Sequence, residues 1–222
     1  MKIARRTFLL GAPALLAGCN TTGSGGGLPS LFDPTYAAMY GEIRDGSVVI
    51  PALDLSAIDN QFLRRQVAFT GRYAPGTVVV DPYERFAYFV MGSGRAMRYG
   101  VGVGRTEAFN FRGDANIARK AAWPGWTPTP NMIRREPQRY GPWAGGMPGG
   151  ITNPLGARAL YLYRGGQDTY YRLHGTNEPY TIGTMVSSGC VRFLNHDIID
   201  LYERVSVGAR AVVLSSRRAF TA

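Results

Sequence analysis

Short runs of apolar and aromatic residues, each ended by glycine, proline or aspartate, dominate the chain from residue 66 onward. This pattern is typical of successive β-strands joined by turns, and it predicts one mostly β domain over residues 66–216. We expect strands at residues 67–70, 77–81, 85–91, 97–103, 159–164, 169–174 and 209–214. Residues 112–158 are rich in Gly and Pro, so we expect loops there.

Two other segments have a helical pattern. Residues 197–205 place Ile198, Leu201 and Tyr202 on one face, which predicts an α-helix late in the chain. Residues 31–65 combine prolines and a glycine with a weak helical pattern over 57–65. We interpret them as a lead-in segment that wraps the domain.

Composition excludes several classes of protein. Of the 222 residues, 45% are hydrophobic and 12% aromatic, and a disordered chain would be poor in both. Two Cys are too few for a domain built on disulfides. The two Cys and two His lie too far apart in the chain for a zinc finger.

The first 18 residues have the pattern of a signal peptide. A basic start is followed by ten apolar residues, 8–17, and a membrane-spanning helix needs about 20. Arg5 and Arg6 resemble the twin-arginine export signal. Ala4 stands where that signal usually has Ser or Thr, so Sec export stays open.

Residues 16–19, Leu-Ala-Gly-Cys, resemble the lipobox of bacterial lipoproteins, in which the chain is cut before the cysteine and the cysteine is lipidated. The resemblance implies a lipid on Cys19; the alternative is a plain signal peptide with an incidental cysteine. Residues 19–30 are rich in Gly, Ser and Thr and would form a flexible tether. Asn20 carries no acidic retention signal. We therefore expect a periplasmic lipoprotein anchored in the outer membrane.

The charge indicates an anionic partner. The chain carries +10, of which Lys2, Arg5 and Arg6 supply three, so the exported part carries +7. A basic surface suits nucleic acid, a membrane surface or an acidic polymer. No basic run is interleaved with aromatic residues, so we do not expect a nucleic-acid module.

With Cys19 lipidated, Cys190 has no disulfide partner in an oxidising compartment. Such a cysteine is either buried and inert or kept for its reactivity. It lies in a turn of small residues, 187–190, where consecutive backbone N–H groups can hold an oxyanion. Arg192, two residues later, would stabilise a nearby anion.

A reactive thiol needs a base, because a cysteine with a pKa of about 8.5 is mostly protonated at neutral pH. His174, at the end of an expected strand, is the candidate base. His196 precedes the expected helix, and we interpret it as a surface or capping residue. From Cys190 and His174 alone, a catalytic pair and a structural thiol beside a surface histidine stay equally open.

A longer pattern favours the catalytic pair. His174-Gly175-Thr176, a spacer, and then Ser188-Gly189-Cys190-Val191-Arg192 resemble the signature of the YkuD-type L,D-transpeptidases. That family often has His where Ser188 stands, and the backbone N–H survives this change. Further segments that resemble the family are residues 99–105, 126–129, 145–146 and 153–156.

The resemblance implies a β-sandwich-like catalytic domain with one or two short helices, acting on the bacterial cell wall. The Cys190 thiolate would attack the third residue of a peptidoglycan tetrapeptide stem, and D-Ala would leave with a proton from His174. An amine of another stem would then take the thioester, which gives a 3→3 crosslink. The resemblance implies no cofactor and no metal.

The same resemblance assigns further roles. The Gly175 carbonyl would orient His174, and the N–H groups of Ser188, Gly189 and Cys190 would stabilise the oxyanion. The expected substrate-binding residues are Arg192, Thr176, Trp126 and Tyr180.

Three alternatives stay open. With another acceptor, the same fold would be an L,D-carboxypeptidase, or an enzyme that attaches a lipoprotein to the wall or detaches it. A wall-binding lipoprotein without turnover is an alternative from another class. A papain-like protease fits poorly, because there the cysteine precedes the histidine in the chain.

Overall fold

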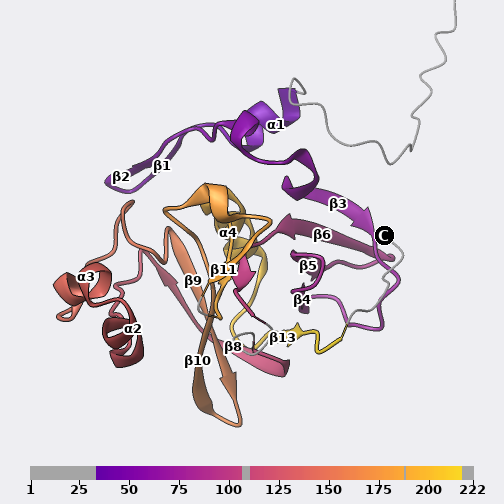
Figure 1. Ribbon diagram of the computed structural model, residues 1–222. Helices are drawn as coiled ribbons and strands as arrows, with labels where there is room; N and C mark the ends of the chain where they lie inside the picture. The colour runs from indigo at the N-terminus through magenta and orange to yellow at the C-terminus, as the bar shows by residue number, and fades with distance from the viewer. Residues whose placement is uncertain (1–33, 107–110, 188, 217–222) are drawn as a thin grey trace, which may run out of the picture.

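The structure is a computed structural model that describes residues 34–106, 111–187 and 189–216 (Figure 1). The expected signal peptide, tether, lipidated Cys19 and oxyanion residue Ser188 lie outside the described residues. Within them, no helix has the length and apolar character needed to cross a membrane.

A nine-stranded sheet confirms the prediction of a mostly β fold. Its order is β12-β10-β9-β8-β13-β4-β5-β6-β3. Neighbouring strands are antiparallel except for the parallel pairs β10–β12 and β4–β13. The strands are β3 Arg65–Ala68, β4 Val78–Asp81, β5 Phe86–Val90, β6 Arg95–Gly100, β8 Gly113–Ala122, β9 Arg158–Arg164, β10 Gln167–His174, β12 Val191–Arg192 and β13 Arg210–Val213.

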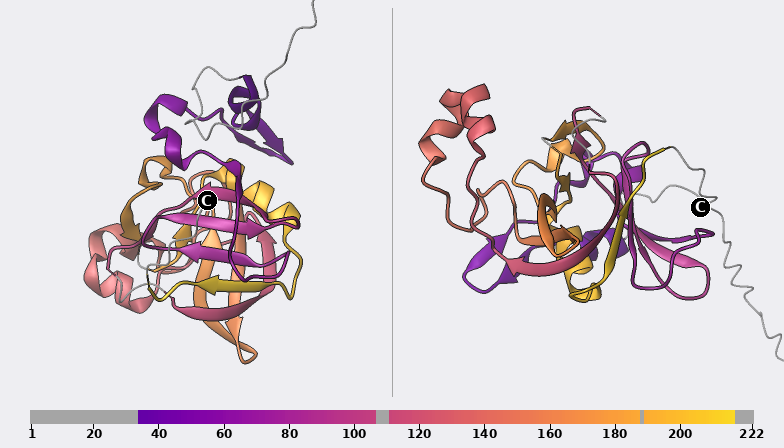
Figure 2. Two further views of the ribbon diagram at one scale, coloured as in Figure 1. Left: turned by 90° about the vertical axis from the view of Figure 1, so that its right-hand side faces the viewer. Right: turned by 90° about the horizontal axis from the view of Figure 1, so that it is seen from below.

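The sheet curls, so that β9 and β10 cross the direction of β4, β5 and β6 (Figure 2). Helix α4, Asn195–Arg204, packs against β9. Along β4 the side chains alternate: Val78 and Val80 join the core that contains Ile198 of α4, and Val79 joins a second core on the other face. Burial on both faces explains the run of three valines in this strand, Val78–Val80.

The lead-in segment covers the second core. It consists of α1 Pro34–Met39, the hairpin β1 Ile43–Asp45 and β2 Val48–Ile50, and the 3-10 turns η1 Leu55–Ala57 and η2 Asn60–Phe62. The prediction of a helix over residues 57–65 is wrong, because this stretch forms short 3-10 turns instead. The side chains of Asp54 and Asp59 accept hydrogen bonds from Ser56 N–H and Gln61 N–H, so they begin two separate short turns.

The expectation that His196 is a surface residue is wrong, because its side chain is buried. Its Nε2 donates to the carbonyl oxygen of Gly41 at 2.8 Å. His196 therefore attaches the lead-in segment to α4.

Residues 112–158 are only partly loop. Strand β8 was missed because Ile117 is its only large apolar side chain. Of its ten residues, four are alanine and four are charged or polar, and Ala115 and Ile117 are the buried ones. Later come α2 Pro130–Arg135, α3 Pro137–Tyr140 and the 3-10 turn η4 Gly141–Trp143, so the described chain has four α-helices rather than one or two. In Figure 2, α2 and α3 form an arm that projects from the sheet.

Candidate active site

The two halves of the sequence motif meet at one edge of the sheet. Strand β12 pairs with β10 in parallel, with Leu173 opposite Val191 and His174 opposite Arg192. Cys190 immediately precedes β12, and paired strands lie about 4.8 Å apart. The register thus brings Cys190 beside β10, where the backbone N–H of Arg172, two residues before His174, donates to its sulfur.

His174 is buried and has one fixed tautomer. Its Nδ1 donates to the Gly175 carbonyl oxygen at 2.6 Å, which leaves Nε2 as the acceptor. Burial and the charges of Arg192 and Arg172 together lower the pKa of His174 to about 3, and the hydrogen bond to Gly175 partly opposes this decrease. The imidazole is therefore neutral at physiological pH, the protonation state that a base requires.

The thiol of Cys190 is half-buried, and its S–H group points to the Tyr170 carbonyl oxygen at 3.9 Å rather than to the ring of His174. Burial raises the pKa of Cys190. A hydrogen bond from the Arg172 backbone N–H and the charges of Arg172 and Arg192 oppose this increase. The resting pair is a neutral thiol and a neutral imidazole, and the role of His174 as base stays a prediction.

Ser187, which the sequence pattern did not single out, shapes the turn before the cysteine. Its buried hydroxyl donates to the Cys190 carbonyl at 2.6 Å and accepts from Gly189 N–H at 3.1 Å. Gly189 has a φ of +128°, a conformation that favours glycine. The Gly189 N–H therefore already has an acceptor. The Cys190 N–H has none among the described residues.

Two glycines pack against one amide behind His174. Asn195 Oδ1 accepts from Ala157 N–H at 2.9 Å. A Cβ on Gly156 or on Gly175 would overlap this oxygen. The close approach explains the glycine after His174 and the glycine that ends the 153–156 segment. Asn195 was missed as a site residue because nothing in its local sequence shows this distant contact.

Ion pairs lie on the other side, beside Arg192. Arg192 pairs with Glu178 at 2.7 Å, and Glu178 also pairs with Arg139 of α3 at 3.2 Å. Arg139 approaches Glu136 at 3.6 Å, and Glu136 approaches Arg105 at 3.6 Å. We call these five residues the charge chain; it links the α2–α3 arm to the strand that follows Cys190.

The other expected substrate-binding residues lie in different environments. Thr176 is buried, and its hydroxyl accepts from Glu178 N–H at 3.0 Å. Tyr180, on the 3-10 turn η5 Pro179–Thr181, is exposed. Trp126 packs edge-on against Tyr140 with ring centroids 6.0 Å apart, so it supports the arm. Their substrate contacts stay predictions.

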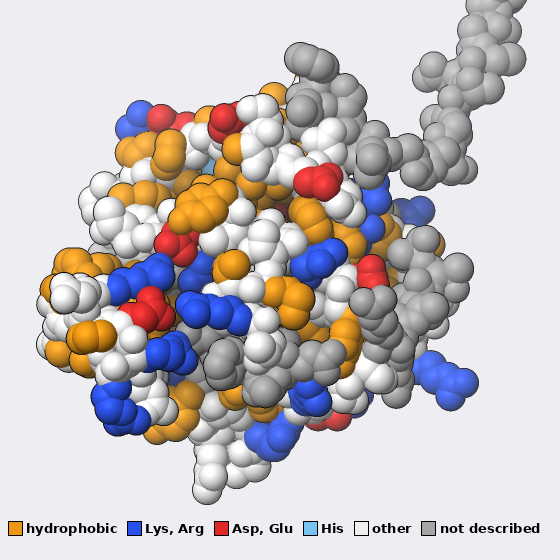
Figure 3. Space-filling view, in the orientation of Figure 1, with side chains coloured by type: hydrophobic (Ala, Val, Ile, Leu, Met, Phe, Trp, Pro, Cys, Tyr) orange, Lys and Arg blue, Asp and Glu red, His pale blue; other side chains and the backbone are white. Residues whose placement is uncertain are grey.

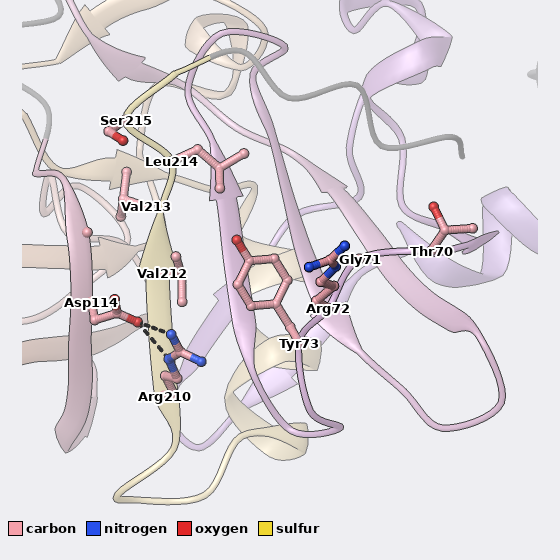
Figure 4. Close-up of a pocket in the computed structure, with 11 residues that line it drawn as sticks. Thr70, Gly71, Arg72, Tyr73, Asp114, Arg210, Val212, Val213, Leu214 and Ser215 are labelled. Carbon is pink, nitrogen blue, oxygen red and sulfur yellow. Dashed lines mark hydrogen bonds and ion pairs between the residues drawn. The ribbon is translucent and has the colours of Figure 1, made fainter.

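A cavity of about 530 Å³ lies elsewhere, beside β13, which is three strands from β10 in the sheet (Figure 4). Arg210 and Asp114 form an ion pair at 2.5 Å in its wall. Among the described residues, no Cys or His lines it. This cavity is therefore separate from the candidate active site.

Comparisons with known proteins bear on the same segment. Residues 75–213 match the family model of the YkuD L,D-transpeptidase catalytic domain. The chain is 31% identical over 192 residues to the probable L,D-transpeptidase ErfK/SrfK of Escherichia coli K12, covering 84% of this chain and 60% of the relative. It is 35% identical over 136 residues to the probable L,D-transpeptidase YbiS of the same strain, covering 61% and 43%.

The chain thus spans about half the length of these two curated relatives. A solved structure from Brucella melitensis, described as a probable carnitine operon oxidoreductase, is 46% identical. The match covers 75% of this chain and 98% of that one, with a TM-score of 0.49.

Proposed function

The chain belongs to the YkuD family of L,D-transpeptidase catalytic domains, and we propose that it is a cysteine-dependent acyltransferase of the cell wall. Enzymes of this family act on peptidoglycan stem peptides. The β10–β12 register, which brings Cys190 beside the strand that carries His174, is the observation that most supports a cysteine mechanism here.

In the proposed first step, the Cys190 sulfur attacks the carbonyl carbon of the third residue of a tetrapeptide stem. The thiol proton moves to Nε2 of His174 during the attack, because thiol and imidazole are both neutral at rest. The Cys190 N–H faces the developing oxyanion. When the C–N bond to D-Ala breaks, His174 returns the proton to the leaving amine, and a thioester remains on Cys190.

In the second step, an amine attacks the thioester. We propose that this amine belongs to the side chain of another stem, so the product is a 3→3 crosslink and the proton of the amine returns to the Cys190 thiolate through His174. With water as acceptor, the product would be a shortened stem. With a lipoprotein amine, it would be an anchored lipoprotein.

We also propose a location. The signal-like residues 1–18 and the lipobox-like Cys19 support export and lipid anchoring in the periplasm, at the outer membrane. The +7 charge of the exported chain suits an anionic wall polymer.

The test measures D-Ala release and products from a synthetic tetrapeptide stem. We expect the unaltered chain to release D-Ala and to form dimers linked through the third residues. Cys190→Ala should abolish both reactions, and Cys19→Ala, the matched change at the other cysteine, should leave them intact. Full activity in Cys190→Ala would contradict the mechanism, and shortened monomers alone would show that water is the acceptor.

A further inference from the structure

Basic side chains crowd around acidic ones on the face between α3 and β9 (Figure 3). The charge chain consists of three arginines and two glutamates. Its members alternate in sign from Arg105 to Arg192. The charge chain therefore carries one more positive than negative charge, and it ends at Arg192, two residues after Cys190.

Glu178 has an unusual position in the charge chain, because each of its two carboxylate oxygens accepts a hydrogen bond from a different arginine. Oε2 accepts from Arg192 at 2.7 Å and Oε1 accepts from Arg139 at 3.2 Å. Two guanidinium groups from distant parts of the sequence thus converge on one carboxylate. Two convergent guanidinium groups form a site suited to any carboxylate of similar position.

We propose that Arg139 and Arg192 form a carboxylate-binding subsite, which Glu178 fills in the free protein and a carboxylate of the donor stem peptide fills in the complex. This inference rests on the proposed function for the identity of the ligand. It assigns substrate-recognition roles to Arg139 and Glu178, which no sequence motif marked.

Solvent exposure favours such an exchange. The side chain of Arg139 is 53% exposed and that of Glu178 is 25% exposed. An ion pair as exposed as Arg139–Glu178 contributes little to stability, so a ligand carboxylate can replace the internal one on Arg139 at little cost. Arg192 is only 18% exposed, and its charge also lowers the pKa of both Cys190 and His174. A carboxylate held by Arg192 would therefore lie within the electrostatic range of both groups.

The position of Arg139 adds a geometric argument. It lies on α3 of the projecting arm, whereas Arg192 lies on the sheet. Glu136 contacts both Arg139 and Arg105, which places the arm beside β7, Val103–Gly104. The arm thus contributes one half of the subsite, and the strand after the nucleophile contributes the other.

The experiment measures binding of two tetrapeptide stems, one with free carboxylates and one with every carboxylate amidated. It uses the full chain carrying Cys190→Ala, so that no reaction consumes the peptide. In this background, we expect Arg139→Gln to weaken binding of the free-acid peptide about threefold and Glu178→Gln to strengthen it about threefold. Neither change should alter binding of the amidated peptide.

Arg134→Gln is the matched control, because Arg134 lies on the same arm and contacts Asn131 rather than the charge chain. It should leave both affinities unchanged. If Arg134→Gln weakens binding as much as Arg139→Gln, the effect is general attraction and the subsite is wrong. Weaker binding in Glu178→Gln would also overturn it.

A second measurement separates this inference from the proposed function. Alkylation of Cys190 by iodoacetate relative to iodoacetamide, read by mass spectrometry of the Cys190 peptide, reports on carboxylate attraction without any stem peptide. We expect the ratio to rise about twofold in Glu178→Gln and to fall about twofold in Arg139→Gln. If stem peptides neither bind nor react but this ratio responds, the proposed function fails and the subsite stands. An unchanged ratio in both variants overturns the subsite.

Discussion

The two sides of the His174–Cys190 region are built in different ways. Behind His174, Gly156 and Gly175 pack against the Asn195 amide so closely that no Cβ fits. In front, Glu178 connects Arg192 to Arg139 through partly exposed ion pairs. One side is held by close packing of backbone, and the other by contacts that a ligand can replace.

This difference separates two requirements of catalysis. Reacting groups must be held within about 0.5 Å of their productive positions, and close packing achieves this. Substrate binding requires groups that can exchange one partner for another, and exposed ion pairs allow this. Changes behind His174 should therefore affect stability and chemistry, whereas changes in front should affect binding.

The largest expected effect comes from His174 itself. His174→Gln keeps a hydrogen-bonding side chain but removes the base, so the single-turnover rate of Cys190 acylation should fall about 10²- to 10⁴-fold. His196→Gln is the matched control, because His196 is also a buried imidazole that bonds to a backbone carbonyl. Equal losses in both variants would remove the case for His174 as base.

The pH dependence of Cys190 acylation provides a second test of the closely packed side behind His174. With the pKa of His174 lowered to about 3 by burial, the imidazole does not gain a proton between about pH 8 and 5. The raised pKa of Cys190 keeps the thiol protonated over the same range. The second-order rate of acylation should therefore be flat there. An acid limb near pH 6.5 that disappears in His174→Gln would contradict a neutral, buried imidazole.

A methyl group behind His174 should have a smaller but clear effect. Gly175→Ala places its Cβ into Asn195 Oδ1 and 3.0 Å from the Ala157 backbone nitrogen. The free energy of unfolding should fall by about 2 kcal/mol, measured by urea denaturation. Gly141→Ala is the control, since a Cβ there meets nothing within 4 Å.

The contact with Asn195 allows a test of whether the overlap with its Oδ1 causes this loss of stability. In the double variant Gly175→Ala and Asn195→Ala, the overlapping oxygen is absent, so the combined loss should be smaller than the sum of the single losses. Strictly additive losses would show that the overlap is not the cause.

The smallest expected effect lies on the front side, at Tyr170. This residue has a φ of +62°, and its side chain is 80% exposed, beside the thiol that contacts its carbonyl. Tyr170→Gly removes a strained left-handed conformation and should raise the free energy of unfolding by up to about 1 kcal/mol. Tyr170→Ala loses the same ring but keeps the strain, so it should give no gain. A similar gain in both variants would assign the effect to the ring.

The strands that the sequence predicted are those with apolar runs, such as β4 and β9, because burial leaves a local pattern. Strand β8 was missed because it has only one large apolar side chain, Ile117, so it leaves no apolar run in the sequence although it pairs with both β9 and β13. The helix expected over 57–65 failed because Asp54 and Asp59 begin two short turns instead.

The residues of the candidate site also differ in whether the local sequence reveals them. Cys190 and His174 carry chemistry in their residue types, and the family pattern links them. Ser187, Asn195 and Glu178 are ordinary polar residues whose importance comes from partners that only the folded chain brings near. From Cys190 and His174 alone, their adjacency stayed open, because it depends on the β10–β12 register.

Whether Cys190 is the nucleophile is tested by the intact mass of the full chain after incubation with a tetrapeptide stem, with the adduct then located by fragmentation. We expect a mass increase on Cys190 equal to the mass of the tetrapeptide minus the mass of the released D-Ala. No such adduct should form in Cys190→Ala. Product formation with the sulfur of Cys190 unmodified throughout, or an adduct on another residue, would contradict it.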